Sequence, residues 1–386
     1  MRLKPWLCSP RASKTPRPRL SSLVWHQSSL SERPPDGLRS VTGAEKEPLS
    51  PLAVTIKDIA RRTGLSVASV SRALADSPSY PVSAKTRERV RAEAQRMGYV
   101  PNVAAKLLAL GETNMVAVLT SGDYDAYHAR LTWHLNELLV ERGMTTLTWY
   151  SRSADDAEDH AAPGLPLAGA IVASTDPAQA RVAEVLVARR RPLVWLTNNS
   201  DGPGDRVLFD LEAGGRLAAD HLAAQGCQRV IFASDAQTLA EPAESARQQT
   251  FTNVAEAAGL TVDTLVVDTG DARAYETFAA ALRNGARVAD GYYCATDTAA
   301  TALLWALGEA GLRVPDDAKV IAGQGTPDCW QRYPALTATE APLAEAAQAA
   351  VDYLLARLDD PGRPAQVRSL PLTLAVRHST AGFDSR

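Results

Sequence analysis

The chain has little of what metal, disulfide, membrane or dinucleotide chemistry requires. Its 386 residues include four cysteines and six histidines, without a CxxC or HxxxH pair. That spacing argues against a metal site and favours free thiols in a reducing compartment. No run of about 18 apolar residues occurs, so no membrane span is expected. The GxGxxG and GxSxG motifs are also absent. An enzyme is therefore not expected, and no cofactor, metal or catalytic residue is predicted.

Charge is distributed unevenly along the sequence. Residues 1–53 carry nine Lys/Arg against four Asp/Glu, residues 54–111 carry ten against four, and the remainder carries 22 against 36. A basic head on an acidic body predicts a polyanionic partner for the head alone. Residues 1–53 are rich in Pro, Ser and Arg, which indicates a disordered basic arm or sequence upstream of a later start. They lack the continuous apolar core of a secretory signal, so a cytoplasmic location is expected.

Residues 54–100 have the pattern of three short helices. Thr55 can cap a helix over Ile56–Thr63, Gly64 supplies a turn, and Ser66 can cap a second helix over Val67–Leu74. A third, basic helix is predicted over residues 83–97. Apolar residues recur at helical spacing on one face of this module, namely Ile56, Ile59, Ala60, Leu65, Val70, Leu74, Val90, Ala94 and Met97. The polar face remains available to a partner.

The motifs VTIKDIA, GLSVASVSRAL, VSAKTRERV and GYVPNVAAKLLA follow one another in this module. In this order they resemble the DNA-binding headpiece of the LacI/GalR family of bacterial transcription regulators. The resemblance implies a hinge helix over residues 101–111 that folds when two copies meet on DNA. Leu108 would then wedge between base steps in the minor groove. In any other short apolar helix it would be an ordinary core leucine.

A headpiece of this kind places its second helix in the major groove, with the first turn against base edges. Val67 and Ala68 in that turn can read bases only by fit and by contact with thymine methyl groups. Arg72 could bind guanine or, equally, a phosphate. The Val-Ala pair resembles that of galactose-repressor-like members, which implies an imperfect palindrome of GTGTAA half-sites around a central CG step. The predicted DNA-binding residues are Thr55, Ser66, Val67, Ala68, Ser69, Ser71, Arg72, Lys106 and Leu108.

From residue 112 onward, apolar runs alternate with amphipathic helices. Eight runs read as buried strands: MVAVL, TTLTWY, GAIVA, PLVWL, RVIFA, TLVVD, GYYCA and KVIAG. Strand and helix in alternation predict a doubly wound parallel sheet, and eight or more strands predict two lobes. The expected fold class is α/β: an all-α headpiece and hinge, then a two-lobed domain of periplasmic-binding-protein type over residues 112–380. Ligands of such sheets bind beyond the carboxyl ends of the strands.

The family's effector domain is also resembled, through ESARQQTF, ATDTAATALLWALGEAGLRVPDDAKVIAG, PALTATEAP and VRHST. The resemblance implies that the chain crosses between lobes near residues 210, 341 and 369. Arg247 would hold a sugar hydroxyl or carboxylate, or could be a surface residue on its helix. Asp297 would contact the effector, or could cap a helix beginning at Thr298. The predicted effector-binding residues are Asp125, Tyr127, His128, Arg247, Asp297 and Gln324.

Three departures from the family pattern weaken the prediction of a simple hexose as ligand. Gln324 stands where the family has an effector-contacting aspartate, and Ala341 where a glutamine is common. The segment between Ser153 and Gly169 is short for a full crossover helix. A different ligand, or none, remains compatible with these changes.

Together these features predict a sequence-specific DNA-binding transcriptional regulator, most simply a repressor, bound as a dimer to a palindromic operator and modulated by a sugar-like molecule. The alternative is a solute-binding protein of the same two-lobed fold, against which the basic headpiece and the missing export signal argue. Tetrameric members carry a terminal leucine heptad helix, whereas this sequence ends VRHSTAGFDSR. A homodimer is therefore expected.

Overall fold

The computed structural model describes residues 54–74, 82–100, 113–121, 125–151, 166–174, 177–198, 202–268, 273–283 and 289–381. The chain divides into two compact units, Met1–Val100 and Pro101–Arg386, which are treated separately below. The expected arm over residues 1–53 and the hinge helix over residues 101–111 lie outside the described residues, as does most of the short segment before Gly169. None of the helices in the described part of the chain is long and apolar enough to cross a membrane.

The first unit contains three helices, α1 (Ile56–Thr63), α2 (Val67–Leu74) and α3 (Ala84–Arg96). A capping box begins α1, because Thr55 N donates to Asp58 Oδ2 at 3.0 Å and Asp58 N donates to Thr55 Oγ1 at 3.4 Å. Gly64 ends α1 in the left-handed region, with φ of 68°. The hydroxyl of Ser66 accepts a hydrogen bond from Ser69 N at 3.1 Å and so caps α2. The helix bounds and caps predicted from the pattern are therefore confirmed.

A small core and a charged clamp hold these three helices together. The buried apolar residues are Ile59, Ala60, Val70, Ala73, Val90 and Ala94. Glu93 on α3 accepts from Arg62 Nε of α1 at 3.0 Å and from Arg96 Nε at 3.0 Å. Hydrogen bonds from Arg96 and then Arg62 lower the pKa of Glu93 to about 2. Glu93 therefore stays ionised at neutral pH and ties α1 to α3 across the outside of the core.

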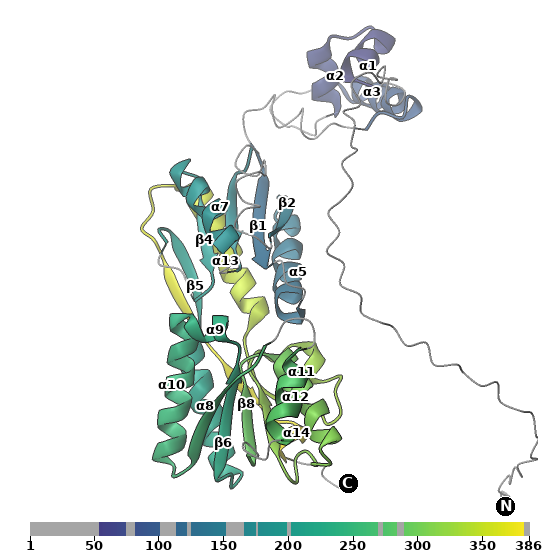
Figure 1. The fold of residues 1–386 in the computed structure, drawn as a ribbon. Coiled ribbons are helices and arrows are strands. Elements are labelled where there is room, and N and C mark those ends of the chain that lie inside the picture. The colour runs from purple at the N-terminus through teal and green to yellow at the C-terminus, as the bar shows by residue number, and fades with distance from the viewer. Residues whose placement is uncertain are drawn as a thin grey trace, which may run out of the picture. The chain divides into compact units, whose positions relative to one another are not determined.

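The second unit consists of two lobes, each built on a six-stranded sheet (Figure 1). The sheet of lobe one has the order β11-β5-β4-β3-β1-β2. Its strands are β1 (Met115–Ser121), β2 (Thr145–Ser151), β3 (Gly169–Val172), β4 (Leu193–Leu196), β5 (Asp205–Asp210) and β11 (Val367–Pro371). The sheet of lobe two has the order β12-β10-β9-β8-β6-β7. Its strands are β6 (Arg229–Ser234), β7 (Thr261–Val266), β8 (Gly291–Cys294), β9 (Lys319–Ala322), β10 (Thr337–Glu340) and β12 (Thr373–Ala375). Neighbouring strands run parallel except for the antiparallel pair β10 and β12.

Helices cover both faces of each sheet, which is the doubly wound arrangement that the sequence predicts. In lobe one, α5 (Ala126–Glu141) and α13 (Leu343–Asp359) pack on one face and α7 (Pro177–Ala188) on the other. In lobe two, α11 (Arg273–Arg283) and α12 (Asp297–Glu309) cover one face, and α8 (Leu211–Ala224) and α10 (Pro242–Ala257) the other. Short helices α9 (Ala236–Ala240), η2 (Pro327–Cys329) and α14 (His378–Ala381) complete this lobe.

The chain passes between the lobes three times. β5 ends at Asp210 and leads into α8, β10 ends at Glu340 and leads into α13, and β11 ends at Pro371 and leads into β12. These connections lie close to residues 210, 341 and 369, where the family resemblance implies them. Three parallel connections between lobes permit hinge motion while they preserve the relative order of the lobes.

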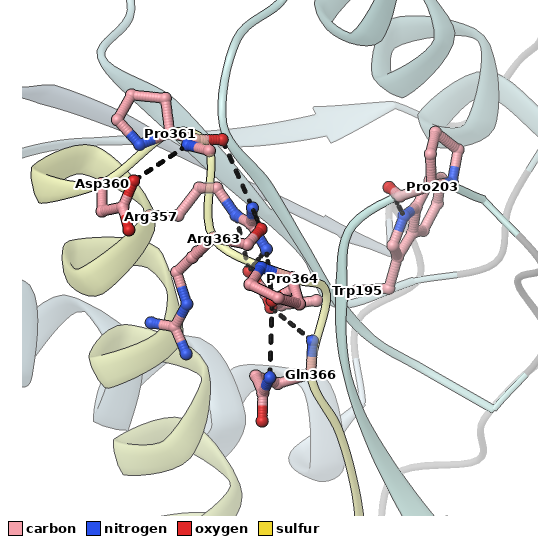
Figure 2. A network of polar contacts seen from close by, with 10 residues as sticks. Trp195, Pro203, Arg357, Asp360, Pro361, Arg363, Pro364 and Gln366 are labelled. Carbon is pink, nitrogen blue, oxygen red and sulfur yellow. Dashed lines mark hydrogen bonds and ion pairs between the residues drawn. The ribbon is translucent and has the colours of Figure 1, made fainter.

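A buried carboxylate joins the lobe-one ends of these three connections. Asp205, at the start of β5, is fully buried and accepts from Arg357 Nε and Nη2 of α13 at 3.0 Å each. It also accepts from the backbone N of Gln366, just before β11, at 2.8 Å. Figure 2 shows Arg357 within this network, where it also donates to the carbonyls of Pro361 at 3.4 Å and Pro364 at 3.3 Å. All three connecting segments are thereby tied to one side chain.

Candidate DNA-binding surface and effector cleft

The first turn of α2 faces outward because the apolar residues that follow it face the core. Ser66, Val67 and Ala68 are exposed, whereas Val70 and Ala73 are fully buried. Val67 leaves 45% of its surface accessible, which is unusual for a valine in a folded module. The structure therefore brings Ser66, Val67 and Ala68 together on one accessible end of a helix, beside the half-buried Ser69 and the exposed Ser71.

Arg72 lies along the outer face of the same helix. Its Nε donates to the carbonyl oxygen of Ala68 at 3.1 Å, which places the guanidinium one turn back along α2. Thr55 is exposed as well, but its hydroxyl donates to Asp58 Oδ2 at 2.7 Å as part of the cap of α1. Two further predicted residues, Lys106 and Leu108, lie outside the described residues.

A cavity of about 200 Å³ lies between the two lobes. Lobe one contributes the start of α5, and lobe two contributes α11, α12 and the loop that follows β9. The described lining residues are Asp125, Ala126, Tyr127, Ala274, Tyr275, Asp297, Thr298, Thr301, Ala302, Trp305, Gln324, Thr326, Asp328 and Arg332. Four of the six predicted effector residues are among them, while His128 and Arg247 are not.

His128 acts on the cavity through Asp125, its neighbour at the start of α5. Asp125 Oδ1 accepts from His128 N at 2.8 Å, and Asp125 Oδ2 lies 2.6 Å from His128 Nδ1. Burial alone would raise the pKa of Asp125, but the hydrogen bond and charge of His128 outweigh it and lower the pKa below its ordinary value. Asp125 is therefore an ionised acceptor at the mouth of α5.

Tyr127 presents a protonated phenol. Burial raises its pKa above the ordinary value, and the negative charges of Asp125 and Glu244 add to that effect, while Arg247 opposes it. The ring packs edge-on against Phe209, with centroids 6.5 Å apart, so its direction is set by lobe one. Tyr127 can therefore donate a hydrogen bond to a ligand that lies across the cavity.

Asp297 organises the loop that forms the far wall. Its carboxylate accepts from the backbone N of Gln324 at 3.1 Å, of Gly325 at 3.1 Å and of Thr326 at 2.7 Å. Gln324 returns a contact, since its Oε1 accepts from Asp297 N at 3.3 Å. The alternative that Asp297 caps the helix is wrong, because α12 begins at Asp297 and the side chain of Thr296 accepts from Ala299 N at 3.2 Å.

Arg247 is buried behind this wall, with 2% of its surface exposed. The alternative that it is a surface residue is therefore wrong. Its Nη1 donates to the carbonyl of Gly323 at 3.3 Å and its Nη2 to that of Ala295 at 3.2 Å. It also forms an ion pair with Glu244, one turn earlier on α10. The guanidinium thus supports the two segments that carry Asp297 and Gln324 to the cavity.

Most of the other lining residues were missed at the level of sequence. Thr298, Thr301, Ala302 and Trp305 share one face of α12 at spacings of three and four, and Trp305 is 68% exposed. A tryptophan on the polar side of an amphipathic helix was the available signal. Thr326 gave none, because only the fold brings it to the cavity. Among the described residues, no cluster of three or more His, Cys, Asp or Glu side chains could hold a metal ion.

Two family models match the chain. One describes bacterial regulatory proteins of the lacI family and covers residues 55–102, and the other describes a periplasmic binding protein-like domain and covers residues 219–380. The HTH-type transcriptional regulator GalR of Streptococcus thermophilus is 25% identical, over 84% of this chain and 99% of that protein.

Solved structures give the same result. The lac repressor bound to ONPG in its repressed state superposes with a TM-score of 0.71 at 23% identity, over 85% of this chain and all of that one. A LacI family transcriptional regulator from Arthrobacter sp. FB24, in complex with lactose, gives a TM-score of 0.60 at 25% identity, over 70% of this chain and all of that one.

The fold and the matches define a class of protein: a helix-turn-helix module followed by a periplasmic binding protein-like domain, as in DNA-binding transcription regulators. Within that class the chain belongs to the LacI/GalR family, whose curated members are regulators and not enzymes.

Proposed function

We propose that this LacI-family regulator binds a palindromic operator as a homodimer and that a small, sugar-like molecule in the interlobe cavity changes its affinity for DNA. The observation that carries the proposal is the composition of the cavity wall. Asp125 and Tyr127 come from lobe one, whereas Asp297, Gln324 and Thr326 come from lobe two. A ligand that bonds to both sets binds one arrangement of the lobes more tightly than another, and that difference is what effector control requires.

The sugar-like character of the ligand is proposed from the cavity and from the relatives. The wall combines carboxylates, an amide and hydroxyl groups with the rings of Tyr127, Tyr275 and Trp305, so it offers both hydrogen bonds and apolar faces. The regulator from Arthrobacter sp. FB24 is described in complex with lactose. The volume of about 200 Å³ lies below the range of roughly 300–1,000 Å³ that is usual for drug-sized ligands, which favours a small sugar.

For DNA, we propose that residues 54–100 form the DNA-binding domain and residues 101–111 the hinge, with residues 112–380 as the effector and dimerisation domain. Val67 and Ala68 would meet the bases in the major groove, while Lys106 and Leu108 would enter the minor groove from the hinge. Repression is the simplest outcome, because a dimer on an operator blocks access to the promoter.

The decisive experiment is a selection of random DNA duplexes by the purified full-length protein at one fixed salt concentration, since phosphate contacts make affinity depend steeply on salt. The expected product is a two-fold palindrome of GTGTAA-like half-sites around a central CG step. The matched control is Ala68→Glu, which places a negative charge on an exposed position of α2 and should abolish enrichment without loss of fold. Enrichment of no sequence would contradict operator binding and favour a solute-binding role.

A further inference from the structure

The charge of Arg247 is balanced from inside the protein. Glu244 lies on the same helix, α10, and forms an ion pair with the Arg247 guanidinium, while 15% of the Glu244 side chain and 2% of the Arg247 side chain are exposed. The rings of Tyr293 and Phe232 lie 5.6 and 5.9 Å from the guanidinium carbon. Arg247 is therefore enclosed by one carboxylate, two carbonyl groups and two rings, and its charge is not available to a ligand.

Without Arg247, the cavity has an acidic excess. Its described lining includes three carboxylates, Asp125, Asp297 and Asp328, and one cation, Arg332. Arg332 itself lies 3.8 Å from Asp328, so part of its charge is already used within the protein. An anionic ligand would meet uncompensated negative charge in a partly enclosed site, where Coulomb repulsion is stronger than in water.

A second observation indicates what the cavity accepts instead. Thr326 lines the cavity with 2% of its surface exposed, and its hydroxyl has no hydrogen-bond partner among the described residues. A buried hydroxyl without a partner is costly, and a neutral hydroxyl group of a ligand can both donate to it and accept from it.

We propose that Glu244 makes the cavity selective for uncharged, hydroxyl-rich ligands and against anionic ones such as phosphorylated sugars. This inference rests on the proposed role of the cavity as the effector site. Glu244 acts through Arg247 and is a specificity-determining residue, because it removes the positive charge that would otherwise attract a phosphate or carboxylate.

The test compares neutral sugars with their phosphorylated counterparts on the full-length protein: glucose with glucose 6-phosphate, galactose with galactose 1-phosphate, and ribose with ribose 5-phosphate. Binding is followed by tryptophan fluorescence, since Trp305 lines the cavity, and by titration calorimetry. For a sugar that binds, the phosphorylated form is expected to bind at least about tenfold more weakly. A phosphorylated form that binds as tightly as its parent, or more tightly, overturns the inference but leaves the effector site intact.

The variant Glu244→Gln removes the charge and keeps the shape of the side chain. It is expected to strengthen binding of the phosphorylated form by about tenfold, with little change for the neutral sugar. The control Glu256→Gln makes the same change at an exposed position of α10 and should leave both affinities unchanged. If Glu244→Gln fails to fold, the comparison on the unmodified protein still decides. Binding of no sugar in either form would contradict the effector site itself.

Discussion

Arg72 has one geometry in the structure and two possible roles on DNA. Truncation to alanine should cost about 1–3 kcal/mol and relax one base position if the guanidinium reads guanine, whereas loss of a phosphate contact would lower affinity evenly. The measurement is binding of Arg72→Ala to the selected operator and to its single-base variants at constant salt. Arg313→Ala, an exposed change in lobe two, is the control. Unchanged affinity for every duplex would remove Arg72 from the DNA surface.

Asp297 matters through the three backbone N–H groups that it accepts. Asp297→Asn replaces one acceptor oxygen by an amide NH₂, which would face those donors. The variant should lose about 1–3 kcal/mol of stability, because buried donors lose their partner. Urea unfolding measures the loss as a lower midpoint with an unchanged slope. Asp316→Asn, a change at a carboxylate that is 62% exposed, should unfold like the original protein. Equal midpoints for both variants would contradict this role.

At the scale of elements, the ion pair between Asp205 and Arg357 should be the strongest single tie in lobe one. Arg357→Ala leaves Asp205 buried and unpaired at the meeting point of β5, α13 and β11, so a loss of about 3–5 kcal/mol is expected. The pair Arg142–Asp352 also joins two helices of lobe one, but both side chains are about half exposed. Arg142→Ala should therefore cost less than about 1 kcal/mol.

A double variant separates the charge from the packing at this site. Asp205→Leu combined with Arg357→Met removes both charges together and should recover much of the stability lost in Arg357→Ala. Urea unfolding of the two variants and the original protein gives the comparison. If the double variant is no more stable than Arg357→Ala, the unpaired carboxylate is not the cause of the loss.

Most strands of the fold could be predicted from the sequence, and the exceptions have a physical reason. All eight apolar runs form strands, because central parallel strands are buried on both faces and so require continuous apolar sequence. β5, β11 and β12 were not among them. β5 alternates between buried and half-buried residues, β11 buries only Leu370, and β12 has three residues. These strands are held by their neighbours in the sheet and not by a hydrophobic run of their own.

At the scale of the whole molecule, a dimer is expected. Trp133 and Val140 on α5 and Tyr150 on the edge strand β2 are 53%, 60% and 62% exposed, an apolar surface on lobe one that a second copy could cover. Val140→Glu should weaken the dimer and lower operator affinity, since both half-sites must then be bound by separate chains. Light scattering across a range of concentrations gives the mass. A tetramer would contradict the expectation, and so would a Val140→Glu dimer of unchanged stability.

The sequence by itself determined the headpiece, the family and the two-lobed fold. Caps, helical spacing and apolar runs are local signals that each stretch carries alone. Only the tertiary structure decided the chemistry of the cavity, because Asp125 and Thr326 reach it from different lobes and far-separated parts of the chain. The ion pair of Arg247 with Glu244 lies within one helix, yet its meaning depends on burial. Whether a charge serves a ligand or a neighbour is decided by what surrounds it, and the surroundings exist only in the folded chain.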